Sequence, residues 1–372
     1  MTQLHLAVGL DGYGWHPHAW RHAFARNATD GGQLSGRYWA ALAGTAERGS
    51  LDFLTIDDSL SAQPGRRADI SPRRLAGRAD AVLVAARIAP VTQHIGLVPV
   101  ATVTHTEPFH VSKSIATLDY VSHGRAGWQA RVSATAHEAA LFGRRPAPDV
   151  DESFDEAADA VEVVRLLWDS WEDDAIIRDV ATGRYVDRDK LHYVDFAGKY
   201  FSVKGPSITP RPPQGQPVVA ALAHAPRIYE FAAGSADVVF ITPHDEESLR
   251  AILGEVAKAR RAAGRDLLVY ADLVVSLAQD PLAPAAEISS DAHVFTGSAD
   301  DLADLVLAWH DVGVDGLRLR PAVHAIDLPA IVDDLVPLLR RAGRFRTGYR
   351  KGETLRERLG LAPAPNRLAV PS

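Results

Sequence analysis

The sequence predicts an α/β protein in which eight parallel strands close into a (β/α)8 barrel. Apolar runs of strand length alternate with amphipathic segments of helical length to the end of the 372-residue chain. That alternation is the pattern of a parallel sheet closed into a barrel. An open doubly wound sheet is the alternative, and it needs a glycine-rich turn that opens a helix after its first strand. Gly9, Gly12 and Gly14 do not open a helix, so the barrel is favoured.

Composition excludes several classes of function. A content of 47% hydrophobic and 23% charged residues supports a large core, and the net charge of -7 argues against a nucleic-acid partner. The absence of cysteine rules out disulfides, thiolate zinc sites and cysteine nucleophiles. No apolar run approaches the roughly 18 residues of a membrane span, and residues 1–10 lack the pattern of a signal peptide. The sequence therefore predicts a cytoplasmic protein without a membrane partner.

The first half of the chain supplies four strands. Residues 95–133 pass from an apolar run through a polar turn and an amphipathic helix to a second strand, which is a βαβ unit with parallel strands. The same reasoning predicts strands at residues 4–10, 51–59, 95–100 and 124–133, and helices at 35–48, 71–87, 110–120 and 151–168.

The second half repeats the alternation after a long excursion at residues 176–216. An excursion of this length between barrel units is typical of a lid or an interface arm. Further strands are predicted at residues 218–222, 237–241, 267–276 and 314–319, with helices at 226–234, 245–263, 299–312 and 327–342. Residues 343–372 form a tail that we expect to lie across the surface, and residues 1–372 are predicted to be a single domain.

One motif is more specific than the rest. Leu118-Asp119, Ser122, Gly124-Arg125 and Gly127-Trp128 resemble the LDxxSxGRxGW segment of the bacterial luciferase-like flavin monooxygenases. The branch is that of the nitrilotriacetate, EDTA and dibenzothiophene-sulfone monooxygenases. The string LWDSWEDDA at residues 167–175 and the tail at 345–367 match the same branch, so the resemblance covers essentially the whole chain.

The resemblance implies a luciferase-like barrel with an insertion after its fourth βα unit. It also implies a two-component monooxygenase that takes reduced FMN from a separate reductase, forms a flavin C4a-hydroperoxide with dioxygen, and oxygenates a small organic substrate. No metal is implied. Members assemble as dimers or tetramers, so a homodimer is expected.

Candidate site residues follow from the resemblance and from the βα loops. The loop at residues 11–21 carries His16, His18 and Trp20, and two histidines and two tryptophans in one loop favour a functional role. Asp58 falls on the family's flavin-contacting aspartate. The other positions that align with flavin contacts are Val100, Ala101, Thr102, Val150, Phe154, His224 and Ala225.

Several of these positions depart from the family pattern. Val100, Val150, Phe154 and Ala225 stand where relatives have hydroxyl or imidazole donors. Each such hydrogen bond is worth about 1.5–3 kcal/mol. These departures favour the alternative of a non-catalytic luciferase-like subunit or binding protein. A further alternative is an oxidoreductase that uses a deazaflavin, because barrels related to the family bind one.

Arg131 is the charged addition. Side chains alternate along the fourth strand, so Gln129, Arg131 and Ser133 share the face that we expect at the barrel mouth. A buried arginine must meet an anion. Asp58 is the predicted partner, and a substrate carboxylate, a cofactor phosphate, Glu138 or solvent stay open as alternatives. Gln129 and Arg131 join the loop residues as catalytic candidates.

Overall fold

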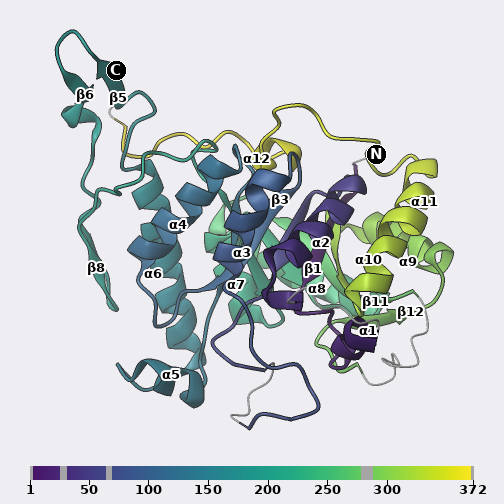
Figure 1. Cartoon of the computed structure of the whole chain (residues 1–372). Coiled ribbons are helices and arrows are strands. Elements are labelled where there is room, and N and C mark those ends of the chain that lie inside the picture. The colour runs from purple at the N-terminus through teal and green to yellow at the C-terminus, as the bar shows by residue number, and fades with distance from the viewer. Residues whose placement is uncertain (1–2, 26–31, 64–68, 278–287, 370–372) are drawn as a thin grey trace.

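A closed barrel of eight parallel strands forms the centre of the computed structural model, which describes residues 3–25, 32–63, 69–277 and 288–369. Neighbouring strands follow the order β10-β9-β4-β3-β2-β1-β13-β11, and pairing of β10 with β11 closes the ring (Figure 1). The barrel prediction is confirmed. The strands are β1 (His5–Leu10), β2 (Phe53–Ile56), β3 (Gly96–Thr102), β4 (Gly127–Arg131), β9 (Val218–Ala223), β10 (Val238–Ile241), β11 (Leu268–Ser276) and β13 (Gly316–Pro321).

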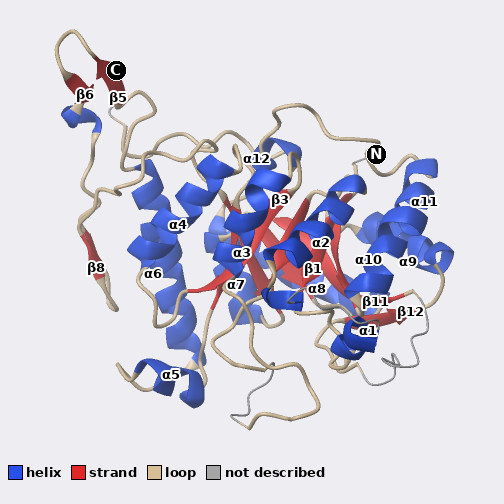
Figure 2. Cartoon of the chain, in the orientation of Figure 1, coloured by secondary structure: helices blue, strands red, loops and turns tan. Residues whose placement is uncertain are grey.

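Helices cover the outside of the barrel, as Figure 2 shows. Their apolar faces pack against strands whose residues are buried on both sides, and this explains why the strands read as nearly continuous apolar runs. The helices are α1 (Ala19–Ala25), α2 (Gly36–Arg48), α3 (Ala81–Ile88), α4 (Pro108–Val121), α5 (Ala136–Phe142), α6 (Val150–Asp169), α7 (Pro226–Ser235), α8 (Glu246–Ala263), α9 (Ala299–Val312), α10 (His324–Ala330), α11 (Val336–Arg341) and α12 (Leu355–Arg358). Short 3₁₀ turns lie at η1 (Gly32–Leu34), η2 (Ala89–Val91) and η3 (Arg188–Lys190).

The prediction of a helix at residues 71–87 is wrong over its first half. Helix α3 begins at Ala81, after an irregular segment that contains Pro72 and Gly77. Asp80 is the N-cap, since its side chain accepts a hydrogen bond from the backbone N–H of Leu83. Proline and glycine oppose helix formation in this segment, and the cap fixes where the helix starts.

Two other elements differ from the predictions. Between α10 and α11 lies the π-helical turn η5 (Ile331–Leu335), where a single helix was expected. A ninth strand, β12 (His293–Thr296), pairs in parallel with the end of β11. This strand has only four residues, and none of them is fully buried, so the sequence shows no strong apolar run there.

The excursion at residues 176–216 forms two small hairpins. Strands β5 (Ile176–Asp179) and β6 (Arg184–Val186) make the first, which projects away from the barrel in Figure 1. Strands β7 (Phe196–Ala197) and β8 (Ser202–Val203) make the second. The second hairpin reaches the start of α6, where Lys199 Nζ lies 3.3 Å from a carboxylate oxygen of Glu152.

The C-terminal tail does more than cross the surface. Leu355 and Leu359 are buried and pack with Phe53, Val98 and Val218 at the amino-terminal end of the strands. The tail thereby closes the base of the barrel and leaves the opposite end for a site. No helix in the described part of the chain is long and apolar enough to span a membrane.

Candidate active site

A cavity of about 690 Å³ opens at the carboxyl ends of the barrel strands. Its wall includes residues at the ends of the strands on opposite sides of the barrel, among them Asp57, Gln129, Leu222 and Arg320. This is the end of a (β/α)8 barrel at which active sites are built. A cavity of this size accommodates a cofactor together with a small substrate.

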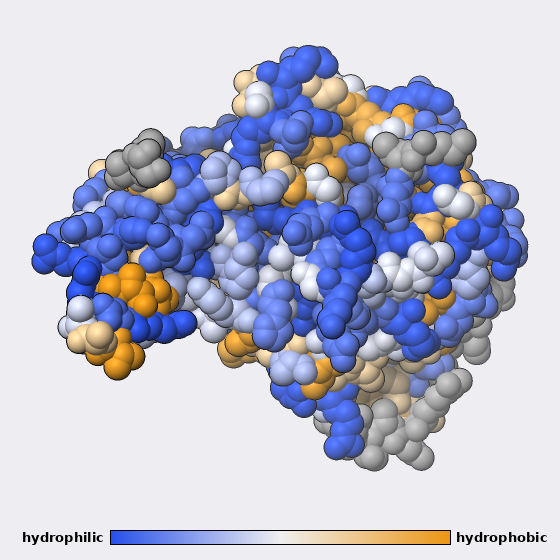
Figure 3. Space-filling model, turned by 90° about the horizontal axis from the view of Figure 1, so that it is seen from above, coloured by the Kyte–Doolittle hydropathy of each residue, from blue (hydrophilic) through white to orange (hydrophobic). Residues whose placement is uncertain are grey.

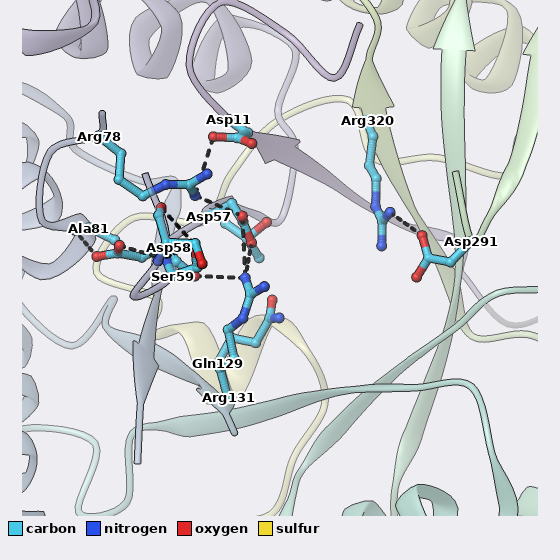
Figure 4. Close-up of polar contacts among 12 residues, drawn as sticks. Asp11, Asp57, Asp58, Ser59, Arg78, Ala81, Gln129, Arg131, Asp291 and Arg320 are labelled. Atoms are coloured by element: carbon cyan, nitrogen blue, oxygen red, sulfur yellow. Dashed lines mark hydrogen bonds and ion pairs between the residues drawn. The ribbon is translucent and has the colours of Figure 1, made fainter. Parts of the chain in front are cut away.

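A row of alternating charges lies along one side of the cavity (Figure 4). Arg131 Nη1 donates to Asp57 Oδ1 at 3.1 Å, and Arg78 Nη1 donates to Asp57 Oδ2 at 3.2 Å. The same Arg78 nitrogen lies 3.6 Å from Asp11 Oδ1. We call Arg131, Asp57, Arg78 and Asp11 the charged row.

The prediction that Asp58 pairs with Arg131 is wrong. Successive residues at a strand end point to different sides, and Asp57 is the one whose carboxylate meets Arg131. The Asp58 carboxylate accepts hydrogen bonds from the backbone N–H groups of Ser59 at 2.7 Å and Ala81 at 3.0 Å. It thus stabilises the start of α3, and only the Asp58 carbonyl oxygen meets Arg131, at 2.7 Å.

Asp11 holds a proton more tightly than an ordinary aspartate. Burial and the nearby Asp57 charge raise the pKa of Asp11 from 3.8 to about 7, although Arg78 and Arg131 act in the opposite direction. With this pKa the Asp11 carboxyl group, which lines the cavity, is partly protonated at neutral pH.

We expect Asp11→Asn to stabilise the protein more at pH 8 than at pH 5. The native state binds a proton that the unfolded state releases, so the free energy of unfolding falls as the pH rises from 3.8 towards 7. Asparagine carries no titrating group, so the variant does not lose this free energy. At pH 8 its melting temperature should be about 2–4 °C higher than that of the unmodified protein. Thermal unfolding at the two pH values measures it. Asp334→Asn, at an exposed position on η5, is the control; an equal gain at both pH values would contradict the assignment.

A second charged network lies deeper, around Asp272. Its carboxylate accepts from Arg318 Nε at 2.7 Å and also binds Arg320, and all three side chains are almost completely buried. Arg318 Nη1 donates to Gln129 Oε1 at 2.7 Å, and Arg320 Nη1 donates to Asp291 Oδ1 at 3.0 Å. These contacts fix the polar floor of the cavity.

Aromatic side chains complete this floor. The Arg318 guanidinium lies 3.8 Å from the ring centre of Phe240, and that of Arg320 lies 4.6 Å from the ring centre of Trp15. The Trp15 indole N–H donates to the Gly9 carbonyl at 2.7 Å, which holds the ring in place. Cation–π contacts of this kind stabilise a buried guanidinium without a further carboxylate.

The loop at residues 11–21 is fixed against the last strand. Backbone N–H groups of Trp15 and His16 donate to the carbonyls of Pro321 and Ala322, each at 3.0 Å. Tyr13, His16 and Trp20 from this loop line the cavity, so its ring side chains form part of the wall. His18 does not border the cavity.

The structure gathers most of the predicted site residues around this one cavity. Those on its wall are His16, Trp20, Thr102, Gln129, Arg131, Val150, Phe154 and His224. Those away from its wall are His18, Asp58, Val100, Ala101 and Ala225. Val100 lies one strand repeat deeper than Thr102, Ala101 faces the opposite side of β3, and Ala225 is the N-cap of α7.

Sequence reasoning does not identify several charged residues of the cavity. Asp11, Asp57 and Arg78 were not selected, and neither were Arg318 and Arg320. A signal for the last two exists, because Leu317 to Arg320 alternates leucine with arginine in a buried strand. Two charges on one face of such a strand must meet buried partners.

The cavity offers groups that fit the phosphate and the ring system of a flavin. Helix α7 begins with Pro226, which has no N–H, and Ala225 supplies no side-chain cap. The N–H groups of Ile228 and Tyr229 donate to the Ala225 carbonyl, so the positive dipole end of the helix is what the site offers to an anion. His224 lies on the cavity wall just before this helix, and Ser153 lies on the wall at the start of α6. Phe154 and Phe231 supply apolar surface nearby.

Comparison with known proteins identifies the family. The model of the luciferase-like monooxygenase family matches residues 20–301. The chain belongs to the luciferase-like monooxygenases. Dibenzothiophene-sulfone monooxygenase of Rhodococcus erythropolis (strain XP) is 31% identical, and the match covers 96% of this chain and 97% of that protein. Nitrilotriacetate monooxygenase component A of Aminobacter aminovorans is 30% identical, with 100% and 99% covered.

Solved structures agree on the fold of this luciferase-like monooxygenase. The structure of DmoA from Hyphomicrobium sulfonivorans superposes with a TM-score of 0.81 at 26% identity, covering 96% of this chain and 92% of that one. The long-chain alkane monooxygenase LadA gives a TM-score of 0.84 at 23% identity, with 97% and 96% covered. The family resemblance seen in the sequence is confirmed, and the protein is a two-component flavin-dependent monooxygenase.

Proposed function

We propose that the flavin is FMN and that the cavity holds it in reduced form together with a small organic substrate. The observation that carries this proposal is the cavity at the carboxyl ends of the strands, which has the start of α7, without a side-chain cap, and His224 on one side. A helix N-terminus with a neighbouring imidazole suits the terminal phosphate of FMN. These groups replace the donors that Val150, Phe154 and Ala225 lack.

The protein's own residues then have three tasks. Bound reduced flavin supplies the electrons that activate dioxygen. Tyr13, Trp15 and Trp20 line the cavity with apolar ring surface and exclude water from it. Arg318 and Gln129 present a fixed polar floor, and Asp11 can hold or release a proton at its carboxyl group near neutral pH.

An anaerobic titration tests the proposal. We expect reduced FMN to bind more tightly than reduced riboflavin, because only FMN carries the phosphate. With a flavin reductase and NADH present, oxygen consumption should increase when a substrate is added. Failure of reduced FMN to bind at about 100 μM would exclude FMN as the flavin, since that concentration corresponds to a weak binding free energy.

We expect His224→Ala to weaken binding of reduced FMN about tenfold and to leave binding of reduced riboflavin unchanged. A charge-assisted hydrogen bond to phosphate accounts for a loss of this size. His244→Ala is the matched control, because His244 is exposed after β10 and does not line the cavity. An equal loss for both flavins in the His224 variant would place the phosphate elsewhere.

We infer that the chain forms a homo-oligomer through the excursion at residues 176–216. This segment does not line the cavity, and its first hairpin projects from the barrel with Val180 94% and Tyr185 62% exposed. Apolar side chains gather at the projecting side of the molecule in Figure 3. Exposed apolar patches favour protein contacts. Light scattering on the intact protein measures the mass, and a monomer at micromolar concentration would contradict the inference.

A further inference from the structure

The Arg131 guanidinium is anchored through only one of its nitrogens. Nη1 makes all of its hydrogen bonds, to the carboxylate of Asp57 and the carbonyl of Asp58. Within the ranges that the structure describes, no hydrogen bond is formed by Nε or Nη2. The side chain is 39% exposed and lines the cavity, so this free edge is accessible to a ligand.

Asp57, which binds Arg131, is itself held in place. Asp57 is bound from its other side by Arg78, and Arg78 lies against Asp11 (Figure 4). A guanidinium held in this way has lost its side-chain freedom before a ligand arrives, which reduces the entropic cost of binding. The charged row therefore presents Arg131 as a fixed donor pair.

The charge balance of the row leaves room for an anion. Two arginines, Arg78 and Arg131, share the one carboxylate of Asp57, and the neighbouring Asp11 is partly protonated at neutral pH. Glu138 also lies on the cavity wall and interacts electrostatically with Arg131, but its carboxylate accepts hydrogen bonds from the hydroxyl groups of Ser61, Ser133 and Thr135 and forms no hydrogen bond with the Arg131 guanidinium.

The two buried arginines of the floor are not available in the same way. Arg318 and Arg320 are bound by Asp272, and their side chains are 3% and 2% exposed. Arg74 borders the cavity as an exposed residue, with no carboxylate partner among the described residues to fix its guanidinium. Arg131 combines a fixed position with free donors.

We propose that Arg131 determines substrate specificity by binding an anionic group of the substrate, a carboxylate or a group of the same shape, along its Nε–Nη2 edge. Two parallel N–H groups on this edge match the two oxygens of a carboxylate. The assignment rests on the proposed function, because it places the substrate in the same cavity as the flavin. A cofactor phosphate offers the same chemistry to Arg131, so the test separates the two sources.

The experiment compares acids with neutral amides of the same shape. Propionate and propionamide, succinate and succinamide, and benzoate and benzamide are titrated calorimetrically into the intact protein with reduced FMN bound, at constant ionic strength. For at least one pair we expect the acid to bind about tenfold more tightly than the amide, which corresponds to about 1.4 kcal/mol. Arg131→Gln should abolish this preference, and Arg131→Lys should retain part of it because it keeps the charge without the fork.

Arg144→Gln is the control, since Arg144 is an exposed arginine that pairs with Glu107 and does not line the cavity. This variant should keep the preference for the acid. The proposal is overturned if no pair shows a preference in the unmodified protein, or if the preference survives in Arg131→Gln.

Affinity for reduced FMN is measured on the same samples. If Arg131→Gln weakens FMN binding and not acid binding, Arg131 serves the cofactor phosphate, and the substrate assignment is wrong. If the unmodified protein does not bind FMN at all, the proposed function fails. The acid and amide titrations, repeated without flavin, then still decide the role of Arg131.

Discussion

Asp272→Ala is expected to destabilise the protein by about 3–5 kcal/mol, because it leaves two buried guanidinium groups without their shared carboxylate. Asp272 is fully buried and binds both Arg318 and Arg320. Arg320 keeps Asp291 in the variant, whereas Arg318 keeps only the neutral acceptors Gln129 and Thr55. The measurement is the midpoint of thermal unfolding compared with the unmodified protein.

A compensated variant shows whether the loss comes from the uncompensated charge. Replacing the network with apolar side chains of similar volume, as in Asp272→Leu with Arg318→Met and Arg320→Met, should restore much of the lost stability. If Asp272→Ala alone melts within about 1 °C of the unmodified protein, the network is not important for stability. A triple variant less stable than the single one would attribute the effect to packing.

Arg125→Met is expected to have a comparable or larger effect. The Arg125 side chain is 3% exposed and donates to backbone carbonyls of Ala89, Thr92, Ile95 and Ser122. Methionine fills part of the volume and leaves these acceptors unpaired, at about 1–3 kcal/mol each where no water replaces the donor. We expect a total loss of more than about 4 kcal/mol.

Soluble yield and melting temperature measure this effect, and Arg87→Met on the exposed side of α3 is the control. Arg125→Lys should be intermediate, because lysine supplies fewer donors and lacks the planar geometry. A stable, soluble Arg125→Met protein would contradict the structural role.

The role of Arg125 shows what the specific motif in the sequence encodes. Ser122, Arg125 and Trp128 carry much of the family resemblance, yet they lie in the packing of the barrel and not in the cavity. The Trp128 ring is fully buried, and its indole N–H donates to the Ala101 carbonyl. The motif therefore predicts the fold, because it specifies how β3, α4 and β4 are joined.

The fold could be predicted because apolar periodicity reflects burial, and the helix start at Ala81 could not. That boundary depends on Asp58 and Asp80, which bind backbone groups near the start of α3, and such local competition is not visible in periodicity. The βα loops were expected to form the site, and residues of these loops line the cavity. The carboxylate that binds Arg131 was not predicted correctly, because choosing between Asp57 and Asp58 requires the direction of each side chain at a strand end.

Pairing of the cavity's charges also bears on how substrates reach it. Arg78 and Arg131 share Asp57, and Arg318 and Arg320 share Asp272, so much of the field of these arginines is cancelled beyond a few ångströms. The chain as a whole carries a net charge of -7. Arrival of an anionic molecule by diffusion is therefore not accelerated by long-range attraction, and its association rate should not fall as salt is added.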